Sequence, residues 1–307
     1  MKAVYAGGFK WLYRCMKTLK DLGEHNAIAA LTANLKAAGD DCAVLPFAGA
    51  PYDLVLTSDP LIAGIHFTAA APPEQIGWKA AARVFSDFAA MGADPQYLLI
   101  NAVAPPEQNF ETLKKIYSGV HDVCAQFSVE LAGGDLAQGP ALELHVFGAG
   151  CVPKDKAVFR SGARAGDAIY VTGALGDSLN TGKHLTFTPR VKEGKWLRQS
   201  GYARAMIDIS DGLATDIRHI LKASGSGADL IPAQIPLNGT LEQALYDGED
   251  FELLFTVRGD EADRFDFDCL HELEHKFHRI GTVTAAPEIL TLAGEPLERK
   301  AFEHFKN

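Results

Sequence analysis

The chain has 307 residues, of which 47% are hydrophobic and 22% charged, and its formal net charge is −10. This composition is typical of a soluble globular protein with one large or two medium domains. The negative charge disfavours nucleic acid and anionic membranes as partners, and no apolar run reaches membrane-spanning length. The five cysteines form no Cys-x-x-Cys pair, which predicts reduced thiols and a cytoplasmic location.

Strand and helix patterns mix along the whole chain, which predicts an α+β fold. Strands are expected at 52–57, 97–103, 142–147, 168–172, 205–209 and 252–257. Helices are expected at 74–91, 110–128, 211–224 and 262–277. The polar segment 151–167, punctuated by Gly and Pro, predicts a boundary between an N-terminal domain, 1–150, and a C-terminal domain, 151–307.

Aspartates gather at the ends of these expected elements. They are Asp41, Asp59, Asp135, Asp208 and Asp211. Because burying a charge is costly unless it is paired or binds a metal, a shared polyvalent cation is the best explanation. Ligands that are all oxygen favour Mg²⁺, which completes its coordination with water and substrate phosphates. Gly134 would let a phosphate approach the backbone beside Asp135.

Asp87 lies within an expected helix rather than at an element end. It borders the apolar stripe Ile76, Ala80, Val84, Phe88 and Met91. It would therefore join the same cation site, although pairing with Arg83 one turn earlier is the alternative. Ser210 and Asp211 have an alternative too, as N-caps of the helix that follows.

Histidines at 271, 275 and 278 form a competing motif. The run from His271 to His275 matches both His-Glu-x-x-His and His-x-x-Glu-His, which on a helix can bind zinc. The alternative is a surface helix with alternating charges. The chain has no Gly-x-x-x-x-Gly-Lys-[Ser/Thr] loop and no Gly-x-Gly-x-x-Gly after a strand, so a phosphate-transferring protein of this sequence uses neither common nucleotide cradle. Gly-x-Ser-x-Gly is also absent.

Eight collinear segments of the chain resemble the thiamine-monophosphate kinase family. This family belongs to a superfamily with aminoimidazole-ribonucleotide synthetase and selenophosphate synthetase. The segments are GDDCAVL at 39–45, TSDPLIAGIHF at 57–67, WKAAARVFSDFAAMGADP at 78–95, LAGGDLAQGP at 131–140, RSGARAGDAIYVTGALGDS at 160–178, AMIDISDGLATDIRHILKASGSGA at 205–228, DGEDFELLFTV at 247–257 and KAFEHF at 300–305.

The resemblance implies a fold of two domains. The N-terminal domain, with ATP and Mg²⁺ sites, would pair across a homodimer into a β-barrel, and the C-terminal α/β domain would complete the active site. The implied reaction is ATP-dependent phosphorylation of thiamine monophosphate to thiamine diphosphate, by direct in-line transfer assisted by several Mg²⁺ ions.

The resemblance also implies roles for individual residues. The implied Mg²⁺ ligands are Asp41, Thr57, Ser58, Asp59, Asp87, Asp135, Asp208 and Asp211, with Asp87, Asp208 and Asp211 closest to the catalysis. The implied ATP contacts are Tyr117, Gly134, Arg160 and Ser210, and the implied substrate contacts are His66, Glu249 and Phe302.

Each of these roles has a structural alternative. Arg160 could pair with Asp155 or cap a strand end, His66 could be a core histidine, Glu249 a turn residue and Phe302 a packing residue. The role of Asp40 is not defined by the pattern.

The sequence departs from the family pattern at a few places. Leu136, Gln138 and Asp247 replace a usual Thr, Arg and Gly, segments 176–190 and 227–247 are short, and 15–38 is unusual. Two further functions therefore stay open: an enzyme of the same superfamily with another acceptor, and a nucleotide-binding homologue that has lost catalysis.

Overall fold

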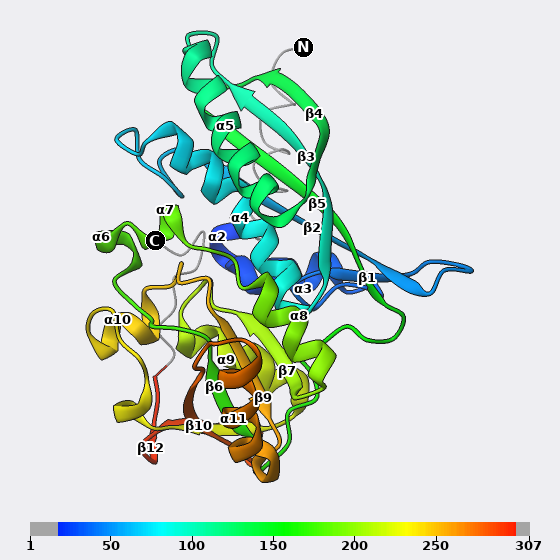
Figure 1. Cartoon of the computed structure of the whole chain (residues 1–307). Helices are drawn as coiled ribbons and strands as arrows, with labels where there is room; N and C mark the ends of the chain where they lie inside the picture. The colour runs from blue at the N-terminus through cyan, green and yellow to red at the C-terminus, as the bar shows by residue number, and fades with distance from the viewer. Residues whose placement is uncertain (1–17, 299–307) are drawn as a thin grey trace, which may run out of the picture. The chain divides into compact units, whose positions relative to one another are not determined.

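The computed structural model describes residues 18–298 of the chain (Figure 1). Of the described residues, 18–38 belong to a compact unit of their own. Within it lie two short helices, α2 Leu19–Leu22 and α3 Glu24–Thr32. Helix α2 begins with a capping box, in which the Thr18 hydroxyl accepts from the Asp21 amide and the Asp21 carboxylate accepts from the Thr18 amide. The remaining elements belong to the second unit, which begins at Gly39.

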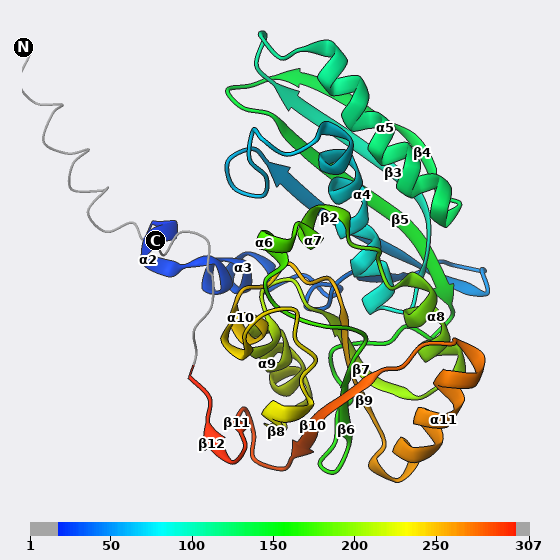
Figure 2. The same cartoon turned by 60° about the vertical axis from the view of Figure 1, so that its left-hand side comes forward.

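Five strands form the first sheet, in the order β1-β2-β5-β3-β4. The strands are β1 Ala43–Pro46, β2 Tyr52–Ile62, β3 Asp94–Ala104, β4 Glu130–Gln138 and β5 Glu143–Pro153. Only β3 and β4 pair in parallel, and α5 Phe110–Phe127 connects them, as a parallel connection requires. Helices α4 Pro73–Ala90 and α5 pack on the buried face of this sheet (Figure 2).

Seven strands form the second sheet, in the order β12-β11-β8-β10-β6-β9-β7. They are β6 Ala168–Val171, β7 Ala203–Asp208, β8 Gly227–Leu230, β9 Leu253–Val257, β10 His278–Thr284, β11 Leu290–Leu292 and β12 Glu295–Pro296. Neighbouring residues of the central strands alternate between two cores: Tyr170 and Phe255 face one, Val171 and Leu254 the other. Covering on both faces explains why β6 is apolar at every position and β9 at all but Thr256.

Helices cover both faces of the second sheet. One core includes residues of α9 Leu213–Ser224 and α10 Leu241–Tyr246, and the other includes residues of α8 Val191–Ser200 and α11 Ala262–Glu272. The short helices α6 Ser178–Thr181 and α7 Lys183–Thr186 and the 3-10 turns Pro232–Gln234 and Gly259–Glu261 complete the described elements.

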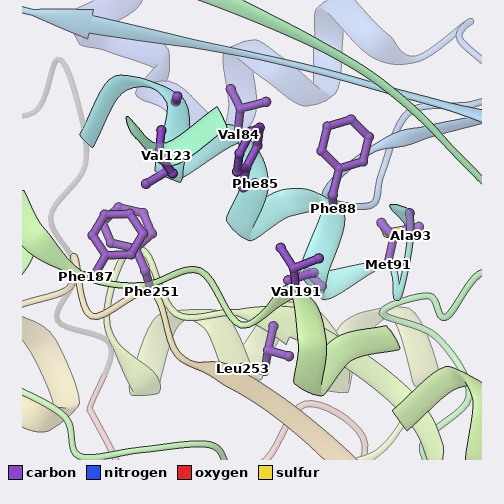
Figure 3. Close-up of a cluster of buried hydrophobic side chains, with 14 of the residues drawn as sticks. Val84, Phe85, Phe88, Met91, Ala93, Val123, Phe187, Val191, Phe251 and Leu253 are labelled. Atoms are coloured by element: carbon purple, nitrogen blue, oxygen red, sulfur yellow. The ribbon is translucent and has the colours of Figure 1, made fainter. Parts of the chain in front are cut away.

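Helix α4 connects the two sheets. It contacts β2, β3 and β5 of the first sheet and β7 of the second, and 12 of its 18 residues are buried. Figure 3 shows Val84, Phe85, Phe88 and Met91 in the core that the two sheets share. A helix buried on nearly every side is normally apolar, yet α4 carries polar side chains at 79, 83, 86 and 87. This spacing places them along one side of the helix.

The mixed α+β, two-domain architecture expected from the sequence is confirmed, with both sheets open. Every expected strand and helix is present, although β2 and β5 continue well beyond their expected ends at residues 57 and 147. The division at residue 150 would fall inside β5, which continues to Pro153. The helix expected at 262–277 ends at Glu272, because Glu274 takes a left-handed backbone conformation with φ of 56°.

Candidate active site

Three aspartates from distant parts of the chain meet where the two sheets approach each other. Asp41 precedes β1, Asp87 lies in the last turn of α4 and Asp208 ends β7. One carboxylate oxygen from each lies within 4.8 Å of the others. We call Asp41, Asp87 and Asp208 the carboxylate cluster. The sequence predicted these three residues as ligands of one cation, and the fold brings them together.

Hydroxyl groups and one guanidinium hold this cluster in place. Thr57 on β2 donates to the Asp87 carboxylate at 2.5 Å, and Ser86 donates to Asp208 at 2.5 Å. Arg160 donates to both oxygens of Asp41, at 2.9 and 3.3 Å. The proposed alternative, pairing of Arg160 with Asp155, is therefore wrong. The backbone amide of Arg160 also donates to Asp40 at 2.7 Å, which gives Asp40 a structural role.

Positive charge is scarce in the carboxylate cluster. Burial, with Asp59 and Asp208 nearby, raises the pKa of Asp87 well above its ordinary value. Burial, with Asp41 nearby, raises the pKa of Asp208 to about 7. Burial also raises the pKa of Asp41, although Arg160 opposes the shift. Three carboxylates facing one guanidinium form an all-oxygen donor set whose charge fits a hard divalent cation.

Strand β2 contributes the predicted ligands that surround this cluster. Asp59 pairs with Arg83 at 3.4 Å, and Arg83 also donates to the carbonyl of Pro60 at 2.8 Å. Arg83 thus pairs with Asp59, whereas the Asp87 carboxylate accepts a hydrogen bond from Thr57. Alternation along the strand directs the exposed Ser58 to the opposite face from Thr57 and Asp59.

The loop after β7 is organised by a residue that the sequence did not single out. The buried Asp216 accepts from the backbone amides of Ser210 and Asp211, at 3.1 and 3.0 Å. Helix α9 begins after Gly212, which makes no side-chain cap, so the expected capping by Ser210 or Asp211 is wrong. Asp211 is not a member of the carboxylate cluster.

Asp135 lies apart from the carboxylate cluster, on the exposed strand β4. It lines a surface hollow of about 520 Å³ together with Tyr117, His121 and Gly134. The glycine is required here because a Cβ at residue 134 would lie 1.8 Å from the carbonyl oxygen of Ile100. The close approach of β3 therefore explains why residue 134 is a glycine, and no bound phosphate is needed to explain it. The predicted ATP contacts Tyr117 and Gly134 nevertheless line the same hollow.

The expected substrate residues His66 and Glu249 are linked through a third residue, Lys79. The Lys79 ammonium donates to both carboxylate oxygens of Glu249, at 2.8 and 2.7 Å, and to the His66 carbonyl at 2.7 Å. Glu249 is therefore more than a turn residue. Phe302 lies outside the described residues.

The histidine motif does not form a zinc site. His271 lies in the last turn of α11, whereas His275 follows the end of that helix and its ring nitrogen lies 2.7 Å from the carbonyl of Thr172. His278 begins β10. Because the three histidines do not share a helix, the zinc interpretation is wrong.

The residues that the sequence missed gave only weak signals. Lys79 and Ser86 interrupt an apolar helix on the same side as Arg83 and Asp87. This spacing could have indicated a polar side of the helix that faces other polar groups. Asp216 lies within the apolar part of α9, where an acid is unusual. Their partners lie more than 100 residues away in two cases, so no local pattern shows them.

Comparison with known proteins defines the family of this chain. A family model described as AIR synthase related protein, N-terminal domain, matches residues 39–152. The thiamine-monophosphate kinase of Escherichia coli (strain K12) is 36% identical over 305 residues, covering 87% of this chain and 91% of the relative. The chain belongs to the thiamine-monophosphate kinase family. The family member from Aquifex aeolicus (strain VF5) is 33% identical over 271 residues, covering 78% of this chain and 87% of that relative.

Solved structures of this family share the fold. The structure described as "AaThiL complexed with AMPPCP and TMP" superimposes with a TM-score of 0.85 and 30% identity, covering 94% of this chain and 99% of that one. A thiamine-monophosphate kinase from Stenotrophomonas maltophilia K279a gives a TM-score of 0.74 and 29% identity, covering 89% and 96%. Among residues 18–298, no helix is long and apolar enough to cross a membrane.

Proposed function

We propose that this protein transfers the terminal phosphoryl group of ATP to thiamine monophosphate and so forms thiamine diphosphate and ADP. Relatives that share more than a third of the sequence are named thiamine-monophosphate kinases. A structure with the same fold is described with AMPPCP, an analogue of ATP, and TMP. The carboxylate cluster of Asp41, Asp87 and Asp208 is the observation that carries the proposal, because it could hold the Mg²⁺ that neutralises phosphate charge during phosphoryl transfer.

The carboxylate cluster fits Mg²⁺ by its chemistry. All of its donors are oxygens, and Thr57 and Asp59 add two more oxygen groups from β2. Bound Mg²⁺ would neutralise phosphate charge on both substrates, which otherwise repel each other. We propose Asp41, Asp87 and Asp208 as the main ligands. Thr57 and Asp59 remain proposed ligands beside them, and Ser58, Asp135 and Asp211 remain proposed ligands of further Mg²⁺ ions.

The chain's own residues would hold and align the two substrates. Arg160, fixed by Asp41, adds positive charge beside the phosphates of ATP. Tyr117 and Gly134 would hold the nucleotide in the hollow beside β4, and Ser210 would contact its phosphates. The accepting group is a phosphate oxygen that is already anionic at neutral pH. The reaction therefore needs alignment more than a general base.

We further propose that the protein works as a homodimer. The face of the first sheet away from α4 and α5 exposes Tyr97, Leu99 and Phe147, whose exposed fractions are 48%, 46% and 40%. Leu99 and Phe147 are direct neighbours across β3 and β5. Exposed apolar neighbours of this kind support a sheet-to-sheet contact that would close the N-terminal domains into a barrel. The C-terminal α/β domain would then complete the active site.

Conditions in the cytoplasm suit this activity, and we place the protein there. The four cysteines within residues 18–298 are free thiols, which supports a reducing compartment.

The direct test is to incubate the protein with ATP, Mg²⁺ and thiamine monophosphate and to measure ADP and thiamine diphosphate together. We expect equal amounts of both products, and their loss in Asp87→Asn. ADP without thiamine diphosphate would point to another acceptor. Binding of ATP without either product would point to a homologue that has lost catalysis, and Leu136, Gln138 and Asp247 would then be the first positions to revert.

A further inference from the structure

Lys79 is an ammonium group with no access to solvent, although it lies on the helix that carries Asp87. Its side chain is 0% exposed, whereas the Glu249 side chain that it pairs with is 22% exposed. A buried lysine is costly unless every charge and donor is satisfied. Lys79 meets this condition, because its three donors reach three acceptors: two oxygens of Glu249 and the carbonyl of His66.

The position of Lys79 on α4 separates it from the carboxylate cluster along one side of the helix. Lys79 lies two turns before Asp87, a rise of about 12 Å along the axis. Between them, Arg83 pairs with Asp59. This side of α4 therefore has the carboxylate cluster at one end and the Lys79–Glu249 pair at the other. A substrate with a phosphate at one end and a polar ring at the other would match such an arrangement.

The loop that carries Glu249 has a strained backbone. Gly248, Glu249 and Phe251 all have positive φ angles, of 73°, 53° and 50°. Left-handed conformations cost free energy for residues other than glycine and persist only where the surroundings impose them. The backbone at Glu249 and Phe251 is therefore held in this conformation by its surroundings.

Several contacts impose this conformation. The Glu249 amide donates to the Ser210 carbonyl at 2.7 Å, and the Ser178 hydroxyl donates to the Glu249 carbonyl at 2.7 Å. Phe251 stacks on Phe187 with ring centroids 4.0 Å apart, as Figure 3 shows. With the backbone fixed in this way, Lys79 sets the direction of the Glu249 carboxylate.

The charge of Glu249 is already balanced within the protein. A carboxylate offers about four lone-pair directions, so two remain after Lys79 has donated to each oxygen. Paired in this way, Glu249 is a weak counter-ion but a well-oriented hydrogen-bond acceptor. It would suit a neutral N–H donor, such as the exocyclic amine of an aminopyrimidine ring, better than a cationic ring.

We infer that Lys79 is a positioning residue for acceptor specificity: it aims Glu249 so that its carboxylate accepts a hydrogen bond from the exocyclic amine of the acceptor's aminopyrimidine. This inference rests on the proposed thiamine-monophosphate kinase function. It assigns Lys79 no contact with ATP or with the carboxylate cluster. Removal of Lys79 should therefore affect recognition of the acceptor and leave recognition of ATP intact.

The test compares two acceptors, thiamine monophosphate and its oxo analogue, in which a carbonyl oxygen replaces the exocyclic amine. For each acceptor, kcat/KM is measured with the wild type and with Lys79→Met. We expect the wild type to prefer the amine by about a hundredfold and the variant to lose about tenfold of this preference, since a buried polar group that loses its partner discriminates poorly. The KM for ATP should change less than about twofold.

Two further variants keep the result interpretable. Lys114→Met removes a surface lysine that pairs with Glu111 at the same 2.7 Å but is 54% exposed, and it should behave as the wild type. If Lys79→Met fails to fold because Glu249 is left charged, the double variant Lys79→Met with Glu249→Gln removes both charges. It should fold and show the same loss of preference.

The possible results of this test distinguish a failure of the proposed function from a failure of the inference about Lys79. A wild type that phosphorylates neither acceptor overturns the proposed function and this inference with it. A wild type that phosphorylates both acceptors equally well, or a Lys79→Met enzyme that keeps its preference, overturns the inference alone. A parallel loss of kcat/KM for ATP and for both acceptors would show that Lys79 only supports the fold, which also overturns the inference.

Discussion

Two buried acidic sites, the carboxylate cluster and Glu252, differ in how their charge is balanced. In the carboxylate cluster, Asp41, Asp87 and Asp208 share one guanidinium, that of Arg160, and their pKa values are raised. At the second, burial also acts to raise the pKa of Glu252, but its contacts with Arg190 and Lys183 outweigh burial, and the pKa is lowered. Glu252 accepts from Arg190 at 2.7 Å and from Thr172 at 2.7 Å.

This difference separates a group that stabilises the fold from one that serves a ligand. The charge of Glu252 is fully compensated by the protein itself, so the folded state favours the ionised form. The carboxylate cluster has an excess of negative charge that the protein does not balance. A fold keeps such an arrangement when an outside cation supplies the missing charge.

Among the substitutions proposed here, Asp87→Asn should have the largest effect on activity. We expect kcat/KM to fall by about a thousandfold, because a proposed ligand of the Mg²⁺ that stabilises the charge of the transferred phosphoryl group is lost. In the absence of Mg²⁺, however, the variant should melt a few degrees higher than the wild type, since repulsion in the cluster is relieved. Activity assays and thermal melts measure the two effects. Asp122→Asn, an exposed change on α5, should alter neither.

Glu252→Gln should show the opposite behaviour. We expect its free energy of unfolding to fall by about 3 kcal/mol, because Arg190 and Lys183 lose their buried partner. Urea denaturation checks this value. An equal loss in Glu261→Gln, whose partner Arg258 is exposed, would show that burial is not the cause.

The lowered pKa of Glu252 also predicts how the free energy of unfolding depends on pH. The folded pKa of Glu252 lies below its ordinary value of 4.5, so its contribution is complete above that pH and is lost as the pH falls through the lower folded value. The stability difference between wild type and Glu252→Gln should therefore be constant from pH 7 to about 5 and shrink below about 4.5. Urea denaturation at stepped pH measures it, and a difference that grows on acidification would contradict the assignment.

Arg160→Gln tests what the guanidinium contributes to the carboxylate cluster. We expect the KM for ATP to rise about tenfold, since one charge-assisted contact to phosphate is lost. Removal of the guanidinium also leaves Asp41 without its ion-pair partner and the cluster with more uncompensated negative charge, so the variant should need less Mg²⁺ for half-maximal activity. Steady-state kinetics at varied ATP and Mg²⁺ test both effects. Arg164→Gln, an exposed neighbour on the same segment, is the control.

Leu136→Thr should have the smallest effect. Leu136 is 61% exposed beside Asp135, so its replacement should change stability by less than about 0.5 kcal/mol. The added hydroxyl restores the usual residue of the family pattern, and we expect the KM for ATP to fall by about two- to threefold, a gain that one hydrogen bond can give. A rise in this KM would show that Leu136 is an adaptation of this chain.

The sequence predicts the strands and helices well where periodicity is strong. Helices α4 and α5 follow long apolar patterns and lie within one residue of their expected bounds, whereas β2, β3 and β5 were found but are longer than expected. Strand β4 was missed because Ala-Gly-Gly-Asp has low strand propensity, and it is held in the sheet by its register with β3. The end of α11 was misplaced because a helical pattern continued past the left-handed Glu274.

The candidate site was predictable only in part. Asp41, Asp87 and Asp208 were found because carboxylates at element ends and within an apolar helix are unusual. Lys79 and Asp216 were missed because their importance comes from partners that only the fold brings close. The split between the carboxylate cluster and the hollow containing Asp135 likewise follows from strand order, which single-sequence patterns do not specify.

The central claim is that the carboxylate cluster is left undercompensated in order to bind Mg²⁺ with ATP. The measurement that tests it most directly is the change in melting temperature on addition of Mg²⁺ and ATP to wild type, Asp87→Asn and Glu252→Gln. We expect the melting temperature to rise clearly for the wild type and for Glu252→Gln, and to rise little or not at all for Asp87→Asn. An equal rise in all three proteins, or none in the wild type, would contradict it.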